Sequence, residues 1–144
     1  MRALATACLG LAGCAYEPSS FRYMMQPFAG QLATVECLDL AVERRADLPS
    51  GSPVLSYTFG NRCDHPVVVD LLAAAVEGHT VEGRRIALSP YDPQYELEVL
   101  RIDGRLVGHE AISYSADTQV RDICVDAATV AHTGATWWLC PGAP

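Results

Sequence analysis

Val54-Leu-Ser-Tyr-Thr-Phe59 is the stretch of sequence that decides the fold. Its large apolar side chains, Leu55, Tyr57 and Phe59, alternate with a serine and a threonine. Because successive side chains of a β-strand point to opposite faces, this alternation predicts a strand with one buried face. Aromatic and β-branched residues also favour extended backbone. The stretch therefore predicts a half-buried β-strand.

Further strand signals lie on both sides of this stretch, and residues that favour turns bound them. Residues 35–43 repeat the alternation with two leucines and a valine, which predicts a second half-buried strand. Asp103-Gly104 is the strongest hairpin signal in the chain. Residues 70–76 are rich in alanine and leave a short helix or a strand open. The other expected strands cover residues 67–69, 95–99, 106–114, 121–126 and 135–140.

Glycine, proline and asparagine indicate the turns between these strands. Gly60-Asn61 marks one turn, Gly78 and Gly83 bracket another, and residues 89–93 form a rigid loop. About seven or eight short strands in roughly a hundred residues predict an all-β fold, namely a small antiparallel β-sandwich. The architecture is immunoglobulin-like or fibronectin-like, although the cysteine and tryptophan spacing of true immunoglobulin domains is missing.

The composition limits the chemistry that this chain can perform. Its 144 residues suffice for one domain, and half of them are hydrophobic, so a packed core is expected. All ten basic residues are arginine, which excludes Schiff-base chemistry on lysine and the lysine of a phosphate-binding P-loop. The formal net charge of −7 repels phosphate backbones and anionic head groups, so nucleic acid is not an expected partner.

The first fourteen residues have the character of an export signal. Arg2 precedes an apolar run over residues 3–12, which is too short for a membrane-spanning helix of about 20 residues. The run ends in Leu11-Ala12-Gly13-Cys14, which resembles the lipobox of bacterial lipoproteins. The resemblance covers a tenth of the chain, and it is specific in residue types and position.

This resemblance implies a cellular address and a covalent membrane anchor. Cleavage would fall before Cys14, whose sulfur would carry a diacylglycerol and whose new amino group would also be acylated. Ala15, in place of aspartate, resembles the class sorted to the outer membrane. The expected organisation is a signal peptide over residues 1–13, a lipid-anchored tether over 14–32 and a β-sandwich domain over 33–144. We expect a location in the cell envelope, attached through lipid to the outer membrane.

The six cysteines divide between the leader and the domain. Cys8 leaves with the signal peptide and Cys14 carries the lipid, so four cysteines remain in an oxidising compartment, where an even number predicts two disulfides. A zinc site is disfavoured because no Cys-x-x-Cys occurs. The four are expected to pair as Cys37–Cys63 and Cys124–Cys140, which can bridge neighbouring strands, and the two other pairings stay open.

The sequence contains no catalytic motif that we would assign. Gly-x-Ser-x-Gly, the P-loop and His-Glu-x-x-His are all absent. Cys63-Asp64-His65 brings three potential metal ligands together, but a site needs a further ligand from elsewhere, and turn residues beside a disulfide are the simpler interpretation. Glu96 and Glu98 share one strand face, which is more simply a solvated face than an acid/base pair. We therefore expect no enzyme, no cofactor and no metal.

Five aromatic residues are the candidates for binding a partner. Phe21, Tyr23 and Phe28 lie in the tether, where they either fold back onto the domain or dock onto another protein. Trp137-Trp138 points one ring to each side of a strand, so one ring is expected in the core and the other exposed or covered.

These observations favour a non-catalytic envelope lipoprotein. Its domain would bind or brace another envelope component through the loops and exposed edges that β-sandwiches commonly offer. An alternative is the inhibition of a secreted protease by the rigid loop at residues 89–93. A hydrolase with an unrecognised site ranks last, because no nucleophile has an evident base.

Overall fold

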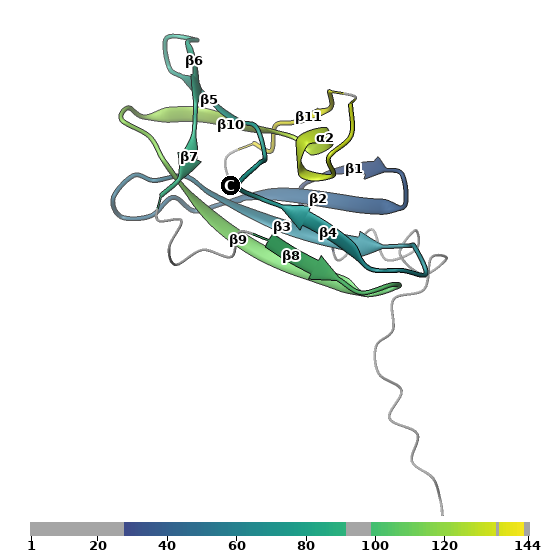
Figure 1. Ribbon diagram of the computed structural model, residues 1–144. Helices are drawn as coiled ribbons and strands as arrows, with labels where there is room; N and C mark the ends of the chain where they lie inside the picture. The colour runs from purple at the N-terminus through teal and green to yellow at the C-terminus, as the bar shows by residue number, and fades with distance from the viewer. Residues whose placement is uncertain (1–27, 92–98, 135, 143–144) are drawn as a thin grey trace, which may run out of the picture.

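The computed structural model describes residues 28–91, 99–134 and 136–142 (Figure 1). Nearly all of its regular structure is β-strand, which confirms the predicted all-β sandwich. The strands are β1 (Gln31–Val35), β2 (Leu38–Arg45), β3 (Val54–Asn61), β4 (Val67–Asp70), β5 (Val76–Thr80), β6 (Arg85–Ala87), β7 (Ser89–Pro90), β8 (Val99–Ile102), β9 (Val107–Ser115), β10 (Val120–Asp126) and β11 (Trp138–Leu139), and the short helix α2 covers Ala127–Val130.

The strands form two main sheets and a separate pair, all antiparallel in the described ladders. One sheet has the order β1-β2-β3-β9-β7, the other has the order β11-β10-β5-β6, and β4 pairs with β8. In Figure 1 the five-stranded sheet runs below β10 and α2, and the β4–β8 pair lies in front of it. A single core cluster takes buried side chains from all three sheets, as expected for a sandwich.

β3 lies in the middle of the five-stranded sheet, between β2 and β9. Its Leu55, Tyr57 and Phe59 are fully buried, which confirms the expectation from their alternation. The hydroxyl groups of Tyr57 and Tyr114 lie 2.6 Å apart and share a hydrogen bond, so these two polar atoms are satisfied inside the core. Burying one large apolar side chain stabilises the fold by roughly 1.5–3 kcal/mol, so β3 is the main anchor of the core.

The segment predicted as one strand over residues 35–43 is a hairpin instead. β1 ends at Val35 and β2 begins at Leu38, and Glu36 in the turn has a φ of 53°. That left-handed backbone is uncommon for a residue with a side chain, so the periodicity gave no sign of a turn here. β1 begins at Gln31, two residues before the expected start of the domain.

β2 is buried on both faces, whereas the sequence predicted one solvated face. Asp39 and Ala41 on the second face are 3% and 1% exposed. Asp39 accepts a hydrogen bond from Thr34 of β1 and pairs with Arg62, so its charge is compensated where the alternation pattern implied contact with water. Near the other end of β2, the buried Arg44 donates to two backbone carbonyls, at Val120 of β10 and the residue after it, and so links the two main sheets.

The Asp103-Gly104 turn is present, but it does not close the predicted hairpin. β8 pairs with β4 and β9 pairs with β3, so the turn passes the chain from one sheet to another. The side chain of Asn61 holds this connection, because it donates to the carbonyls of Ile102 and Asp103. A Cβ at Gly104 would lie 2.6 Å from the carbonyl carbon of Asp64, so the close approach of two backbones requires glycine.

Several predicted turns lie elsewhere. Gly60 and Asn61 are the last residues of β3, and the chain turns over residues 62–66 instead. Gly78 is a buried residue of β5, where a Cβ would lie 2.9 Å from a valine side chain of β10. Residues 71–75 form neither of the two elements left open for them.

The predicted rigid loop begins as a strand. Ser89 and Pro90 form β7, which pairs with the end of β9, and the N–H of Tyr91 donates to the carbonyl of Ser113. Proline is tolerated there because β7 is an edge strand. Residues 92–98 lie outside the described residues, so the rest of the loop, its neighbouring carboxylates and the start of the next expected strand are not placed.

The two disulfides form in the pairing that the sequence favoured, Cys37–Cys63 and Cys124–Cys140. The first joins the β1–β2 turn to the segment after β3, and the second joins β10 to the residue after β11. The leader, including Cys14, lies outside the described residues. Within the described part of the chain, no helix has the length and apolar character needed to cross a bilayer.

Candidate functional site

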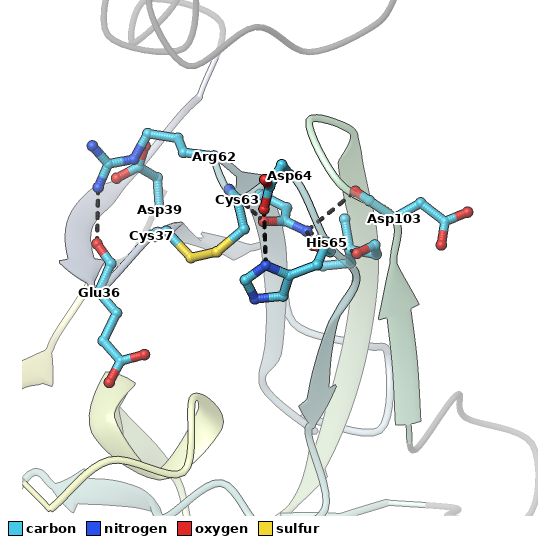
Figure 2. Close-up of a disulfide and its surroundings, with 10 residues drawn as sticks. Glu36, Cys37, Asp39, Arg62, Cys63, Asp64, His65 and Asp103 are labelled. Carbon is cyan, nitrogen blue, oxygen red and sulfur yellow. Dashed lines mark hydrogen bonds and ion pairs between the residues drawn. A yellow bond between two sulfur atoms is a disulfide. The ribbon is translucent and has the colours of Figure 1, made fainter.

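The surroundings of the first disulfide form a closed polar cluster, shown in Figure 2. We call it the Cys37–Cys63 cluster. Arg62 Nε lies 2.9 Å from Asp39 Oδ2, an ion pair by distance although the N–H direction does not make it a hydrogen bond. Arg62 Nη2 donates to the carbonyl of Glu36, so the guanidinium also fastens the β1–β2 turn.

Asn61 completes this cluster from the end of β3. It is fully buried, and its amide nitrogen donates to the carbonyls of His65, Ile102 and Asp103 at 2.9, 2.9 and 3.2 Å. Its amide oxygen accepts a hydrogen bond from the N–H of Cys63. The polar atoms of Asn61 are therefore fully engaged in holding backbone, which is a structural role.

The Cys63-Asp64-His65 segment does not assemble a metal site in the described residues. The sulfur of Cys63 is bonded in the disulfide, and Asp64 and His65 are exposed and contact each other. The hydrogen bond from His65 lowers the pKa of Asp64 below its usual value. Among residues 28–91, 99–134 and 136–142, no three histidine, cysteine, aspartate or glutamate side chains come close enough to hold a metal ion.

The surroundings of the second disulfide are open to solvent and carry both tryptophans. Trp137 and Trp138 are 47% and 37% exposed, so the expectation that one ring enters the core is wrong. Leu139 takes the core position instead, opposite Val125 of β10. Trp137 lies before β11 and is held by the start of α2. Its N–H donates to the side chain of Asp126, the N-cap of α2, and its carbonyl accepts from the N–H of Ala127, the first residue of that helix.

Trp137 borders a shallow hollow of about 310 Å³. It lies between the β1–β2 turn and the α2 segment, and its surface is mostly apolar. We call it the Trp137 hollow. Its lining residues are Thr34, Val35, Glu36, Ala128, Thr133, Thr136 and Trp137.

A second hollow of about 180 Å³ lies on the outer face of the four-stranded sheet, and we call it the Trp138 hollow. The strand register places its members side by side, because Cys124 lies opposite Glu77 and His79 lies opposite Arg85. Arg85 Nη1 and Glu77 Oε2 are 3.8 Å apart, within ion-pair distance. The full lining is Glu77, His79, Arg85, Cys124, Trp138 and Cys140.

Gln31 fixes the end of β11, the strand that contains Trp138. Its amide nitrogen donates to the carbonyl of Cys140 at 3.0 Å, and its amide oxygen accepts from the N–H of Cys140 at 2.7 Å. This pair of hydrogen bonds joins β1 at the edge of one sheet to β11 at the edge of the other. The two-residue strand β11 is thus held by β10, by a disulfide and by Gln31.

The sequence did not point to the polar half of the Trp138 hollow. Glu77 and His79 belong to β5, which was missed because Gly78 between them indicated a turn. The alternation Val-Glu-Gly-His-Thr is the signal that would have found this strand, with Glu77 and His79 on its solvent face. A third hollow of about 430 Å³ lies between β6 and the end of β9, and no aromatic ring lines it.

The other candidate residues are placed as follows. Phe28 is half-buried at the start of the described chain, and Phe21 and Tyr23 lie outside the described residues. The four domain cysteines pair as two disulfides, one in the Cys37–Cys63 cluster and one at the Trp138 hollow.

Comparison with solved structures finds a chain of similar fold. The chain is similar to the yjhA protein from Bacillus subtilis, with a TM-score of 0.51 over 80% of this chain and 97% of that chain. The two sequences are 8% identical, so the likeness shows the fold alone. The sequence matches no model of a known protein family, and it matches no curated protein.

Proposed function

We propose that this chain is a lipid-anchored protein of the bacterial cell envelope whose β-sandwich is a non-catalytic binding module. The observation that carries the proposal is the state of its cysteines. All four cysteines of the domain are paired in disulfides, which persist in compartments outside the cytoplasm. The two cysteines left over, Cys8 and Cys14, both belong to the leader.

The anchor in this proposal is the lipid on Cys14. One acyl chain binds a membrane only marginally, whereas two or more hold a protein stably, at about 0.8 kcal/mol per buried CH₂. The chain's net charge of −7 gives no electrostatic attraction to anionic lipid, so the covalent lipid has to supply the attachment. Ala15 after the cysteine favours the outer membrane.

The binding role is supported by what the domain leaves exposed. Two tryptophans lie at the surface, Trp138 on the strand β11 that is held at three points and Trp137 just before it, and rigid exposed aromatic rings are typical anchors for a partner. The partner we propose is another component of the envelope.

The mass of the mature protein tests the anchor directly. We would express the full chain in a bacterial host, supply labelled palmitate and measure the intact mass of the membrane-bound product. We expect a protein that begins at Cys14, carries lipid and has no free thiol. Cys14→Ser should lose the label and the membrane fraction, and Cys8→Ser is the matched control that should keep both. Retention of Met1, or a mature Cys14 without lipid, would overturn the proposal.

A further inference from the structure

We propose that the Trp138 hollow binds a neutral polysaccharide, with the indole ring of Trp138 stacked on a pyranose and the polar side chains bonded to its hydroxyl groups. This inference deepens the proposed function, because it names the envelope component as a glycan. It rests on that function only for the location at which the glycan is met.

Trp138 supplies the aromatic surface of the hollow. Trp138 is 37% exposed, whereas the next residue, Leu139, is buried in the core. The face of an indole ring is electron-rich, and the C–H groups along one face of a pyranose are weakly positive, so the two surfaces attract. β11 is fixed by its ladder to β10, by the disulfide at Cys140 and by Gln31, so the ring is preorganised before a ligand arrives.

Three polar side chains lie on the same face of the sheet as Trp138. Glu77 supplies a carboxylate that only accepts hydrogen bonds, Arg85 supplies a guanidinium that only donates, and His79 can do both. A sugar hydroxyl donates one hydrogen bond and accepts others, so adjacent hydroxyls match alternating acceptors and donors. The register of β10, β5 and β6 sets these three side chains beside the disulfide in a fixed order.

The charge of the hollow selects a neutral ligand. Glu77 and Arg85 lie within ion-pair distance and offset each other, so the hollow offers little excess charge to an anion or a cation. The chain as a whole is acidic and contains no lysine, which disfavours anionic polymers further.

The size of the hollow selects a chain over a small molecule. Pockets that enclose small molecules measure about 300–1,000 Å³, whereas this hollow measures about 180 Å³ and is open to solvent. A shallow contact of this kind suits one ring of an extended polymer that runs across the face of the sheet.

The Trp137 hollow lacks this combination and therefore serves as an internal control. Its lining has no arginine and no histidine, and its charged member is Glu36 alone. The chain contains two tryptophans, so a Trp137→Phe variant reports on Trp138 alone by its fluorescence, and a Trp138→Phe variant reports on Trp137 alone.

The experiment titrates both variants with neutral hexasaccharides. The protein is the full chain with Cys14→Ser, purified with its disulfides formed, and the probes are cellohexaose, hexa-N-acetylchitohexaose, maltohexaose and laminarihexaose. We expect a saturable change in the emission of Trp137→Phe with at least one probe and no change in Trp138→Phe. In calorimetry, Trp138→Ala should weaken binding about tenfold or more, and Arg85→Ala severalfold.

Each alternative outcome overturns the proposal. No response in Trp137→Phe to any of the four probes, or an equal response in the two variants, would show that Trp138 is not a sugar site. Thermal melting of each variant separates lost binding from lost folding, and Trp138→Phe keeps an aromatic ring should Trp138→Ala fail to fold. If crosslinking in cells recovers one protein that Trp138→Ala loses, while no sugar responds, the surface docks a protein instead. The lipid test reads Cys14 independently, so either proposal can fail alone.

Discussion

The two disulfide regions contain the same kinds of residue but differ in burial and in role. Each combines a disulfide with an amide side chain that holds backbone, Asn61 beside Cys37–Cys63 and Gln31 beside Cys124–Cys140. In the first region the amide is fully buried, and the neighbouring charges are turned toward each other. In the second the amide is exposed, and an aromatic ring with three charged or titratable side chains borders solvent. The first region stabilises the fold, and the second is available to a ligand.

The largest expected effect follows from the difference in burial of the two amides. Asn61→Ala removes a fully buried amide that donates to three backbone carbonyls and accepts from one backbone N–H, so the free energy of unfolding should fall by about 4 kcal/mol. Gln31→Ala removes two hydrogen bonds that water can replace, so the loss should be about 1 kcal/mol or less. Urea unfolding followed by circular dichroism measures both.

The pair of substitutions also checks the assignment of roles. If Gln31→Ala destabilised the protein as much as Asn61→Ala, burial would not distinguish the two regions, and the comparison would be broken. The sugar titration gives a second measurement. In it, Gln31→Ala should weaken binding because β11 loses the hydrogen bonds from Gln31 to Cys140, even though the domain stays folded.

Removal of each disulfide should have an intermediate effect. The cysteines are 26 residues apart in Cys37–Cys63 and 16 residues apart in Cys124–Cys140, so the loop-closure model expects losses of about 3.5 and about 3 kcal/mol respectively. Double substitution of either pair to alanine should lower the unfolding midpoint by similar amounts. Native tryptophan emission should change more in the second variant, because Trp138 lines the hollow formed with Cys124 and Cys140, whereas the first disulfide reaches Trp137 only through the neighbouring β1–β2 turn. A change in emission of the same size in both variants would contradict that placement.

The sequence predicted those features of the fold that depend on neighbouring residues, and it did not predict those that depend on contacts between distant residues. The alternation in residues 54–59 predicted the central strand, and the number and spacing of cysteines favoured the correct pairing, because both depend on nearby residues or simple counting. The role of Asn61 was not predictable, because a glycine-asparagine pair usually favours a turn. Here the side-chain amide is buried because it donates to the carbonyls of Ile102 and Asp103, which are distant in the sequence. The Asp103-Gly104 turn likewise has the correct local geometry, but the strands beside it pair with others.

The candidate site was predicted only in part for the same reason. The tryptophan pair was singled out, but the burial of one ring was expected from strand alternation. A single capping interaction decided otherwise, because Asp126 holds the N–H of Trp137 and leaves Leu139 to enter the core. Glu77 and His79 were hidden by Gly78, whose missing side chain makes room for β10 and does not make a turn. Tertiary packing overruled local propensity at each of these positions.

The smallest expected effect concerns two acidic groups, one beside the first disulfide and one on the β5–β6 turn of the sheet that carries the Trp138 hollow. A hydrogen bond from His65 lowers the pKa of Asp64 beside the first disulfide, and a hydrogen bond from Thr80 lowers the pKa of Glu82 at the β5–β6 turn. A carboxyl whose pKa is lower in the folded state adds stability above its unfolded pKa, and this contribution disappears as the pH falls through the folded pKa. Both carboxyls are exposed, so the effect on unfolding should be slight, and the site-specific titration is the sharper measurement.

Carboxyl carbon shifts followed by NMR between pH 2 and 6, a window chosen to span the usual carboxyl range, would resolve the two groups. His65→Ala should raise the pKa of Asp64 toward its usual 3.8 and leave Glu82 unchanged. Thr80→Val should raise the pKa of Glu82 toward 4.5 and leave Asp64 unchanged. Cross-effects in either variant would mean that the first disulfide region is coupled to the four-stranded sheet that carries the Trp138 hollow, and the separation of a structural region from a binding surface would then not hold.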